Sequence, residues 1–245
     1  MSIKCDKWIR RKSTQPTHIL FKEAGVVLPA WAGLSHTQEK LDDLSNRFHA
    51  TPVTDKILNE ELKWRPMIEP FEPDLVRKQG DIKLISYGTT SYGYDVSLAD
   101  YGLELFTNVN SAVINPRKPD PKCFVKPEIR TDEDGCPYVL LPPNSYLLGP
   151  TVEYFRIPRE ILIICLGKST YARSGIAINC TPIEPEFEGN VVIEIANQTN
   201  LPAMIYLKQG IAQFLFLEAD EVCEVSYADR GGKYQGQTGM VHSKV

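Results

Sequence analysis

Short apolar stretches separated by turn-forming residues dominate the chain from about Asp81 onward. Pro, Gly, Asn and Asp punctuate them, as in Pro142-Pro143-Asn144, which is typical of strands joined by tight turns. Many short strands at close spacing predict a β-sandwich or barrel rather than alternating strands and helices. The predicted strands are Tyr138–Leu141, Tyr146–Leu148, Glu160–Leu166, Val191–Ala196, Ala203–Leu207 and Ile211–Leu217.

The first 66 residues follow a different pattern. Thr37–Phe48 and Thr54–Trp64 have apolar residues at helical spacing, and Thr54 or Asp55 can cap the second helix. The break at Ala50-Thr51-Pro52 separates the two predicted helices. We therefore expect residues 1–52 to form a partly helical segment appended to a β domain that spans residues 53–245.

The composition of the chain excludes some classes of partner but does not identify a function. An apolar fraction of 42% in 245 residues is sufficient for a real core, and the net charge of -4 argues against a nonspecific nucleic-acid partner. No apolar run approaches the ~20 residues of a membrane-spanning helix, so no membrane partner is expected. The charged N-terminus lacks the apolar stretch of a secretory signal, which predicts a cytoplasmic location. Six cysteines without a C-x-x-C pair predict free thiols.

One carboxylate interrupts an apolar strand. In Val191–Ala196 the side chains of Val192, Glu194 and Ala196 share a face, because alternate residues of a strand point the same way. The pattern alone favours a solvated face for Glu194, and a pocket is the alternative. In a pocket, desolvation would raise the pKa of Glu194. It could then take a proton from water and return it to a leaving group near neutral pH, with Arg173 as the candidate to balance its charge.

Two further segments fit phosphate binding. Gly167-Lys168-Ser169 offers backbone N–H groups, a cation and a hydroxyl, although it lacks P-loop spacing and also fits a plain turn. Residues Ala228–Gly239 combine four glycines with Arg230, Lys233 and two glutamines. Such a flexible, cationic strip suits a lid over a triphosphate, and a disordered C-terminus is the alternative.

The sequence lacks the ligands of zinc-dependent nucleotide deaminases. Those enzymes hold the metal with H-x-E and P-C-x-x-C motifs. None of the four histidines, His18, His36, His49 and His242, is followed by x-Glu. We predict no catalytic zinc.

Together these segments resemble the dCTP deaminase family. Its motif G-[RK]-S-[ST]-x-A-R-x-G is met by Gly167–Gly175, and its next motif resembles Thr181–Asn197, which places the family's catalytic glutamate at Glu194. Further matches are Ser91–Leu98, Gly210–Phe216, and Tyr227 with Asp229–Gly239. The resemblance covers most of the chain, from about Asp55 to His242.

The resemblance implies a distorted jelly-roll-like β barrel of the dUTPase-like type, here with a helical N-terminal extension. It implies a homotrimer with active sites between subunits, dCTP as substrate, dTTP as a candidate feedback inhibitor, and Mg²⁺ carried by the triphosphate. The implied catalytic residues are Glu194, Arg173 and Ser169. The implied substrate-binding residues are Lys168, Ser169, Thr170, Tyr171, Ala172, Arg173, Val192, Ile193, Glu194, Gln213, Tyr227, Lys233 and Gln237.

The nearest rival is dUTPase, whose attacking water is activated by an aspartate in I-D-x-x-Y-x-G. Here Ile183–Gly189 carries Glu184 in place of that aspartate and Phe187 in place of the tyrosine. Bacterial-type dUTPases carry no glutamate at the position of Glu194, so deamination is favoured. A bifunctional enzyme that forms dUMP, a dUTP pyrophosphatase, and a nucleotide-binding protein without turnover remain alternatives. Lys168, where many relatives have arginine, keeps the charge but loses the bidentate fork.

The N-terminal boundary has two interpretations. Family members open with D-K-x-I about a dozen residues before an aliphatic-x-Pro. Asp55-Lys-Ile-Leu before Ile68-Glu-Pro70 fits this opening and makes the preceding residues an extension. Lys4–Arg11 also resembles the opening and would make the middle of the chain an insertion of roughly 45–50 residues. We prefer the extension.

Overall fold

The computed structural model describes residues 1–14, 19–21, 26–28, 52–53, 65–107 and 112–243. Strands make up 44% of it and helices 8%, which confirms the mainly β class. The chain divides into two compact units, one formed by Met1–Ile9 with Met67–Val245 and the other by Arg10–Pro66. We call the first unit the β domain.

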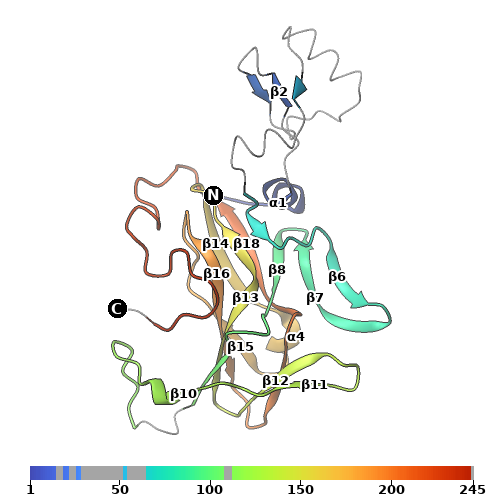
Figure 1. Ribbon diagram of the computed structural model, residues 1–245, viewed down its shortest axis with the longest axis vertical. Coiled ribbons are helices and arrows are strands. Elements are labelled where there is room, and N and C mark those ends of the chain that lie inside the picture. Colours follow the sequence, from blue (N-terminus) through green and yellow to red (C-terminus); the bar gives the residue numbers. More distant parts are fainter. Residues whose placement is uncertain (15–18, 22–25, 29–51, 54–64, 108–111, 244–245) are drawn as a thin grey trace. The chain divides into compact units, whose positions relative to one another are not determined.

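The β domain contains two large antiparallel sheets and a small one (Figure 1). The first sheet has the order β6-β7-β8-β18-β14, with β1 also paired to β18. Its strands are β1 (Ser2–Ile3), β6 (Leu75–Gln79), β7 (Ile82–Thr90), β8 (Gly93–Ser97), β14 (Ile161–Gly167) and β18 (Gly210–Glu218).

The second sheet has the order β10-β9-β13-β16-β15, with β5 paired to β13. Its strands are β5 (Ile68–Glu69), β9 (Glu104–Phe106), β10 (Phe124–Val125), β13 (Tyr146–Arg156), β15 (Ile176–Asn179) and β16 (Glu188–Asn197). The small sheet comprises β11 (Ile129–Thr131), β12 (Pro137–Leu141) and β17 (Ala203–Tyr206). The short helices are η3 (Pro121–Cys123) and α4 (Ser169–Ala172).

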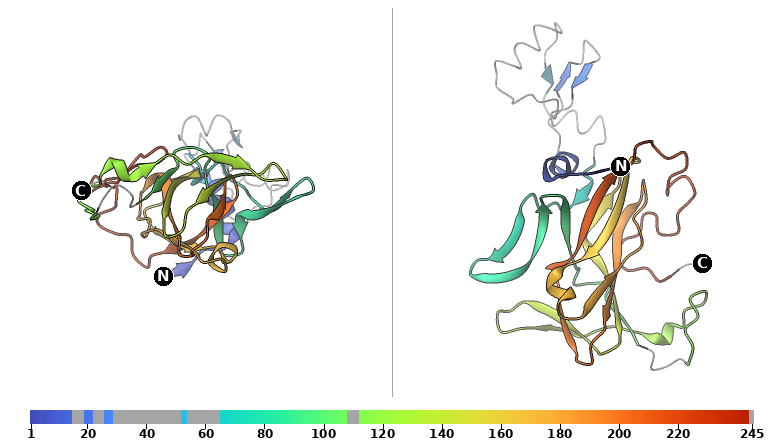
Figure 2. Two further views of the ribbon diagram at one scale, coloured as in Figure 1. Left: turned by 90° about the horizontal axis from the view of Figure 1, so that it is seen from below. Right: turned by 180° about the vertical axis from the view of Figure 1, so that it is seen from behind.

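The core lies between the two large sheets. Phe155 of β13 and Phe214 of β18 are fully buried, and their ring centroids are 5.1 Å apart. Each of the six predicted strands is present. Strand β13 continues eight residues beyond the predicted end at Leu148, and β16 extends the prediction by three residues at its start and one at its end. The described strands form open sheets rather than a closed barrel. In this respect the fold differs from the predicted barrel. The β6–β7 hairpin projects from one side of the domain, and the C-terminal tail runs along the other (Figure 2).

The first nine residues belong to the β domain. Ser2 and Ile3 pair with Glu218 and Leu217 of β18. Helix α1 (Asp6–Ser13) then buries Ile9, and it places Trp8 6.0 Å from the ring of Phe216. This arrangement differs from the boundary predicted at residue 52, and it favours the second opening, at Lys4–Arg11.

The other unit, Arg10–Pro66, contains a small antiparallel sheet in its described residues. Strand β2 (Ile19–Phe21) pairs with β3 (Val26–Leu28) and with β4 (Pro52–Val53). The predicted helices Thr37–Phe48 and Thr54–Trp64 lie outside the described residues. In the part of the chain that the structure describes, every helix is too short or too polar to cross a membrane.

A buried carboxyl group in β13 gives the stability of the fold a pH dependence. Glu153 is 2% exposed and accepts hydrogen bonds from the Ser97 backbone N–H and hydroxyl, the latter at 2.8 Å. Burial raises the pKa of Glu153 from 4.5 to about 7. Between these values the folded protein binds more protons than the unfolded chain, so the free energy of unfolding falls as pH rises. The fall amounts to about 3 kcal/mol.

We expect Glu153→Gln to remove this pH dependence, because glutamine can accept from Ser97 without a charge. Denaturant unfolding of the wild type and the variant would be compared at about pH 5 and about pH 8. The variant should gain about 3 kcal/mol relative to the wild type between the two conditions. Parallel pH dependence in the two proteins would show that Glu153 does not titrate in this range.

Candidate active site

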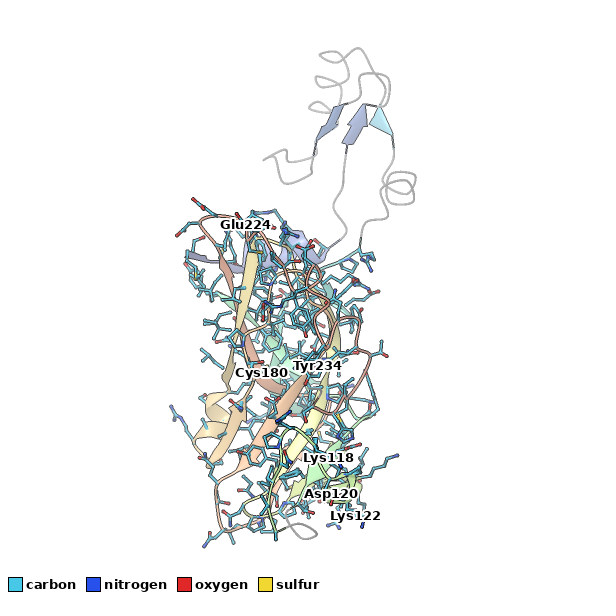
Figure 3. All side chains as sticks on the ribbon, turned by 90° about the vertical axis from the view of Figure 1, so that its left-hand side faces the viewer. Lys118, Asp120, Lys122, Cys180, Glu224 and Tyr234 are labelled. Carbon is cyan, nitrogen blue, oxygen red and sulfur yellow. The ribbon has the colours of Figure 1, made fainter. Side chains whose placement is uncertain are left out.

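A pocket opens between strand β16 and the C-terminal tail. Its volume is about 800 Å³, which is within the range of small-molecule sites. Cys180 and Tyr234, two of its lining residues, lie near the middle of the face seen in Figure 3, away from the loop that carries Lys118, Asp120 and Lys122. The residues that the site uses are Leu148, Cys180, Ile183, Glu184, Phe187, Val192, Glu194, Tyr227, Arg230, Lys233, Tyr234 and Gln237.

Strand β16 directs Glu194 into this pocket. Val191, Ile193 and Ile195 face the core and are at most 5% exposed, so the alternation of the strand turns Val192 and Glu194 the other way. The prediction that Val192 and Glu194 share a face is confirmed. The surface that they share lines the pocket rather than facing open solvent.

The carboxyl group of Glu194 is set up to exchange a proton near neutral pH. Burial raises the pKa of Glu194 to about 7, although a backbone hydrogen bond opposes the shift. Its Oε2 atom is buried and has no hydrogen-bond partner in the described residues. The Oε1 atom of Gln237, in the same pocket, is buried in the same way. Such orphan acceptors are costly unless a ligand or water supplies donors, so the pocket is shaped for a polar ligand.

The segment Cys180–Phe187 forms one wall of the pocket. Ile183 exchanges two backbone hydrogen bonds of 3.0 Å with Ile163 of β14, which fixes this segment against the first sheet. Glu184 then faces the tail, where its carboxylate pairs with Arg230. Phe187 is 7% exposed and meets the ring of Tyr227 edge-on at 5.8 Å. The wall and the tail therefore hold each other in place.

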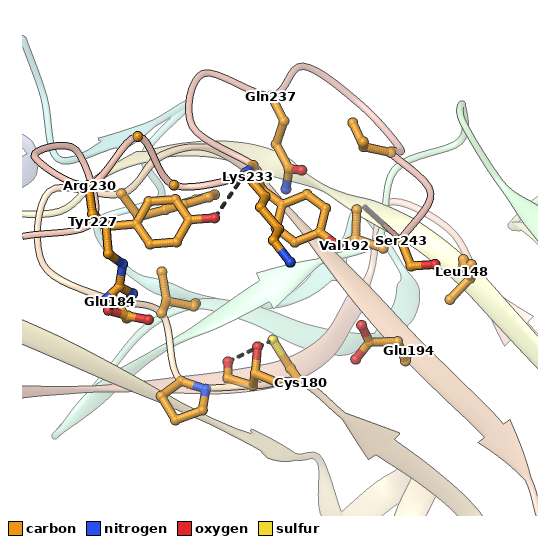
Figure 4. A pocket seen from close by; sticks show the side chains of 18 of the residues that line it. Leu148, Cys180, Glu184, Val192, Glu194, Tyr227, Arg230, Lys233, Gln237 and Ser243 are labelled. Atoms are coloured by element: carbon orange, nitrogen blue, oxygen red, sulfur yellow. Dashed lines mark hydrogen bonds and ion pairs between the residues drawn. The ribbon is translucent and has the colours of Figure 1, made fainter. Parts of the chain in front are cut away.

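The tail is an ordered strap across the pocket (Figure 4). Arg159 anchors its start by ion pairs of 2.7 Å to Glu186 and Asp229, and the guanidinium lowers the pKa of Asp229 to about 2. The Tyr227 hydroxyl accepts from the Tyr234 N–H at 2.9 Å. Only glycine fits at position 232, since a Cβ atom there would lie 2.1 Å from the Tyr227 ring. The alternative of a disordered C-terminus is therefore wrong for the described part of the tail.

Strand β16 has a gap in its pairing beside Glu194. On one edge β15 pairs with β16 only as far as Glu194, which lies opposite Asn179. On the same edge the tail forms a β-bridge with β16, in which Gln237 lies opposite Gly189. Among the described strands none pairs with this edge over Val191–Ile193. The backbone at this point is available to a ligand that offers a hydrogen-bonding edge.

A second group of predicted site residues lies elsewhere in the chain. Lys168 forms an ion pair with Asp95 and a 3.2 Å hydrogen bond with the Ser86 hydroxyl. Burial raises the pKa of Asp95, although Lys168 opposes the shift. Gln213 also hydrogen-bonds to Asp95 and donates to Thr90 at 3.2 Å. This cluster joins β7, β8, β14 and β18 and does not line the pocket.

Arg173 is separated from Glu194 by the length of strand β15. Ile176 pairs with Asn197 and Asn179 pairs with Glu194, so α4 and Arg173 lie beyond the far end of β15. Three residues along a strand correspond to about 10 Å. The tail and α4 lie on different sides of the β domain (Figures 1 and 2). One chain therefore does not bring Arg173 to the carboxylate.

Relatives of this chain were found by sequence. A profile of dCTP deaminase-like proteins matches residues 53–219. The chain is 53% identical over 192 residues to a dCTP deaminase of Thioalkalivibrio sulfidiphilus, covering 78% of this chain and 98% of that protein. It is 59% identical over 174 residues to a dCTP deaminase of Laribacter hongkongensis, covering 71% and 88%. The chain belongs to the dCTP deaminase-like family.

Solved structures resemble this member of the family only distantly. A 2'-deoxycytidine 5'-triphosphate deaminase of Agrobacterium tumefaciens aligns with a TM-score of 0.38 and 15% sequence identity, covering 54% of this chain and 40% of that one. This similarity is too low to support an argument about the site.

The pocket of this dCTP deaminase-like chain contains part of the predicted site. Glu194, Val192, Tyr227, Lys233 and Gln237 come together there. Among the described residues, the lining of the pocket does not include Lys168, Ser169, Thr170, Tyr171, Ala172, Arg173, Ile193 or Gln213.

Two of the predicted substrate-binding side chains are committed to the core. Tyr171 is 4% exposed, and its hydroxyl accepts from the Tyr206 N–H at 3.0 Å. The Ile193 side chain is fully buried, so only its backbone can face a ligand. We therefore assign both side chains to packing. Ser169, Thr170, Ala172 and Arg173 are exposed.

Several pocket residues, among them Cys180, Arg230 and Tyr234, were not among the predicted site residues. Cys180, Arg230 and Tyr234 carry no motif of their own, although Arg230 and Tyr234 lie within the segment predicted as a lid. Cys180 reaches the pocket because the pairing of Ile163 with Ile183 positions its segment. This pairing joins residues 20 positions apart, and the local sequence pattern does not predict it.

Proposed function

We propose that this chain is a dCTP deaminase that hydrolyses the exocyclic amino group of dCTP to give dUTP and ammonia. The observation that carries the proposal is the carboxyl group of Glu194, which is directed into a nucleotide-sized pocket with a buried, unpartnered oxygen. The relatives at 53% and 59% identity are named dCTP deaminase, which gives the substrate.

In the proposed reaction Glu194 acts first as a base and then as an acid. Its carboxylate takes a proton from a water molecule, and the resulting hydroxide attacks C4 of the cytosine ring. The carboxyl group then returns the proton to the amino nitrogen, which leaves as ammonia. A pKa of about 7 suits both steps, because neither form of the carboxyl group is rare at neutral pH.

We propose that the rest of the pocket recognises the nucleotide. The unpaired edge of β16 at Val191–Ile193 would read the hydrogen-bonding edge of the pyrimidine. Lys233 and Gln237, held by the tail, would contact the sugar or the triphosphate, and the Tyr227 ring would close the apolar side. Magnesium would be carried by the phosphate oxygens and water. Among the described residues no group of three or more His, Cys, Asp and Glu side chains could hold a metal ion.

We further propose a homotrimer in which a neighbouring subunit completes each pocket. The segment Gly167–Arg173 exposes Ser169, Thr170, Ala172 and Arg173, but it lies away from Glu194 of the same chain. A second copy that presents this turn to the pocket would unite the two groups. In that arrangement Ser169 and Arg173 would orient the attacking water. Binding of dTTP in the same pocket would inhibit the enzyme by competition.

Product analysis tests the proposal. Purified, chelator-treated protein supplied with magnesium would be incubated separately with dCTP and with dUTP, and the nucleotides separated by chromatography. We expect dUTP and ammonia in equal amounts from dCTP, and no change in dUTP. Formation of dUMP and pyrophosphate would replace the proposal by the bifunctional reaction or by a dUTP pyrophosphatase. Binding of dCTP without turnover would identify a nucleotide-binding protein.

A further inference from the structure

A second cavity of the β domain is bordered by three cations, Arg77 and Lys78 of β6 and Lys83 of β7, and its volume is about 530 Å³. Ser86 of β7, Thr170 of α4 and the turn between β11 and β12 form other parts of its lining. The β6–β7 hairpin, α4 and the β11–β12 turn lie on the same side of the β domain (Figures 1 and 2). We call the three residues the hairpin cations and the space the hairpin cavity.

The hairpin brings these cations together at a cost to its own stability. Lys78 lies directly opposite Lys83 in the ladder of β6 and β7. Like charges at opposed positions of two strands repel each other and destabilise the pairing. The ladder also shifts register between Val76 and Lys78, so Arg77 lies at an irregularity. Adjacent residues of a regular strand point to opposite faces, whereas Arg77 and Lys78 both border the cavity. Departures of this kind from local rules are typical of functional sites.

The hairpin cations are available to a ligand. All of them are exposed, and none has an ion-pair partner in the part of the chain that the structure describes. Lys168, whose ammonium group donates to the Ser86 hydroxyl at 3.2 Å beside the cavity, differs from them because it is paired with Asp95. The positive charge of the hairpin is therefore not balanced by the described residues around it.

Two carboxylates on the opposite wall of the cavity limit its affinity for an anion. Asp132 and Asp134 lie in the turn between β11 and β12. Asp132 Oδ1 accepts hydrogen bonds from the backbone N–H groups of Asp134 and Cys136, at 3.0 and 2.8 Å, so its charge is partly compensated within the turn. The cations still outnumber the carboxylates by three to two. Asp134 is the group that most directly opposes a bound anion.

The hairpin cavity adjoins the segment to which the family resemblance assigns phosphate contacts. Thr170 belongs to Gly167–Arg173 and lines the cavity. The base of the hairpin is fixed, because the Ile85 N–H donates to Gln209 Oε1 at 2.8 Å and Gln209 is 4% exposed. The hairpin cations and this segment thus face one space of the size of a small-molecule site.

We infer that the hairpin cavity binds a chain of linked phosphates through Arg77, Lys78 and Lys83. Such a chain presents several negative oxygens in a row, which match three cations in one cavity better than a single carboxylate does. Arg77 offers a planar fork to two phosphate oxygens, and the lysines act as point charges. The phosphates belong either to the triphosphate of dCTP, held along Gly167–Arg173, or to a separate molecule that carries a polyphosphate group.

Hydrogen exchange of the full chain tests the site at its own position. Inorganic tripolyphosphate would be titrated into the protein at an ionic strength held constant with sodium chloride, and peptides that cover Leu75–Thr90 would be followed by mass spectrometry. At about ten times the Kd of the site, we expect the hairpin amides to exchange about tenfold more slowly, because a ligand that binds only the folded hairpin opposes its opening. No slowing in these peptides would overturn the inference.

Lys78→Gln/Lys83→Gln removes two of the hairpin cations. We expect its Kd for tripolyphosphate to rise about tenfold, so the same concentration should slow exchange only about twofold. Lys118→Gln/Lys126→Gln is the matched control, since it removes the same charge from exposed lysines outside the cavity lining, and it should behave as the wild type. Equal slowing in Lys78→Gln/Lys83→Gln and in the wild type would contradict a site at the hairpin.

Asp134→Asn has the opposite expected effect. Loss of the opposing carboxylate should lower the Kd for tripolyphosphate by about threefold. A purely structural role of the β11–β12 turn predicts no such gain. A Kd that is unchanged or higher in this variant would show that the phosphates do not lie in the cavity.

The kinetics of dCTP turnover identify the source of the phosphates, and they rest on the proposed function. A KM for dCTP about tenfold higher in Lys78→Gln/Lys83→Gln, with unchanged kcat, would assign the cavity to the triphosphate of the substrate. An unchanged KM, together with the loss of the tripolyphosphate effect, would assign it to a separate ligand. Hydrogen exchange requires no turnover, so absence of its effect overturns the site, whereas absence of turnover overturns only the proposed function.

Discussion

Replacement of Glu194 by glutamine is expected to lower kcat for dCTP by about 10³-fold. Glutamine keeps the size of the side chain and its hydrogen-bonding capacity, but it cannot take a proton from water at neutral pH. The affinity for the nucleotide should change by less than about threefold, because Lys233, Gln237, Tyr227 and the β16 backbone remain in place. Single-turnover kinetics with dCTP, together with titration of the bound nucleotide, measure the two effects separately.

Glu184→Gln is the matched control for this variant. Glu184 lines the same pocket, but its carboxylate is paired with Arg230 and is partly exposed to solvent. Loss of this pair should reduce kcat by less than about tenfold. A large loss in Glu184→Gln with near-normal turnover in Glu194→Gln would move the base to Glu184, the position of the dUTPase aspartate, and would contradict our assignment.

Subunits that are inactive alone are expected to restore activity when mixed. Glu194→Gln and Arg173→Ala should each be nearly inactive, since one lacks the base and the other lacks the cation that balances it. In a mixed trimer, a pocket with Glu194 from one subunit and Arg173 from another is intact. Equal amounts of the two chains, assembled at random, should give activity in about a quarter of the sites.

The mixing experiment distinguishes a shared site from a site within one chain. Co-expression of the two chains with different affinity tags and purification on both tags removes the homotrimers, so about one third of the sites in the purified trimers should be intact. Lack of any activity in them, with normal assembly by light scattering, would show that Arg173 and Glu194 act within the same subunit. In that case α4 would have to move toward Glu194 by the length of β15. The reason is that Ile176, the first residue of β15, lies opposite Asn197, and Arg173 lies before it, beyond the end of β15 that is farther from Glu194.

Alternation and turn residues were sufficient to predict six strands of the β domain, namely β12, β13, β14, β16, β17 and β18. Segments such as Val191–Ala196 combine apolar residues with a sharp end at a polar residue, so local sequence determines both their type and their approximate limits. Strand β1 could not be predicted in this way, because it has only two residues and is held by β18, more than 200 residues away. The same long-range pairing explains why the structure groups residues 1–9 with the β domain, whereas the sequence pattern placed them in the N-terminal segment.

The site was harder to predict than the fold. The alternation of β16 predicted which face of the strand Glu194 lies on. Whether that face is exposed to solvent depends on the tail and on Cys180–Phe187, and the alternation of one strand contains no information about these segments. Tyr171 lies in a motif of exposed residues, yet its hydroxyl is bound to Tyr206. The motifs thus identified the candidate site residues. The structure was needed to show which of them are buried, and that some line the pocket whereas others lie around α4.

The pH dependence of kcat/KM for dCTP tests most directly whether a desolvated carboxylate is the base. Burial raises the pKa of Glu194 to about 7, and only the ionised form can accept a proton from water. We predict that kcat/KM rises about tenfold per pH unit below pH 7 and levels off above it. A value that stays constant from about pH 5 to about pH 8 would contradict this role for Glu194.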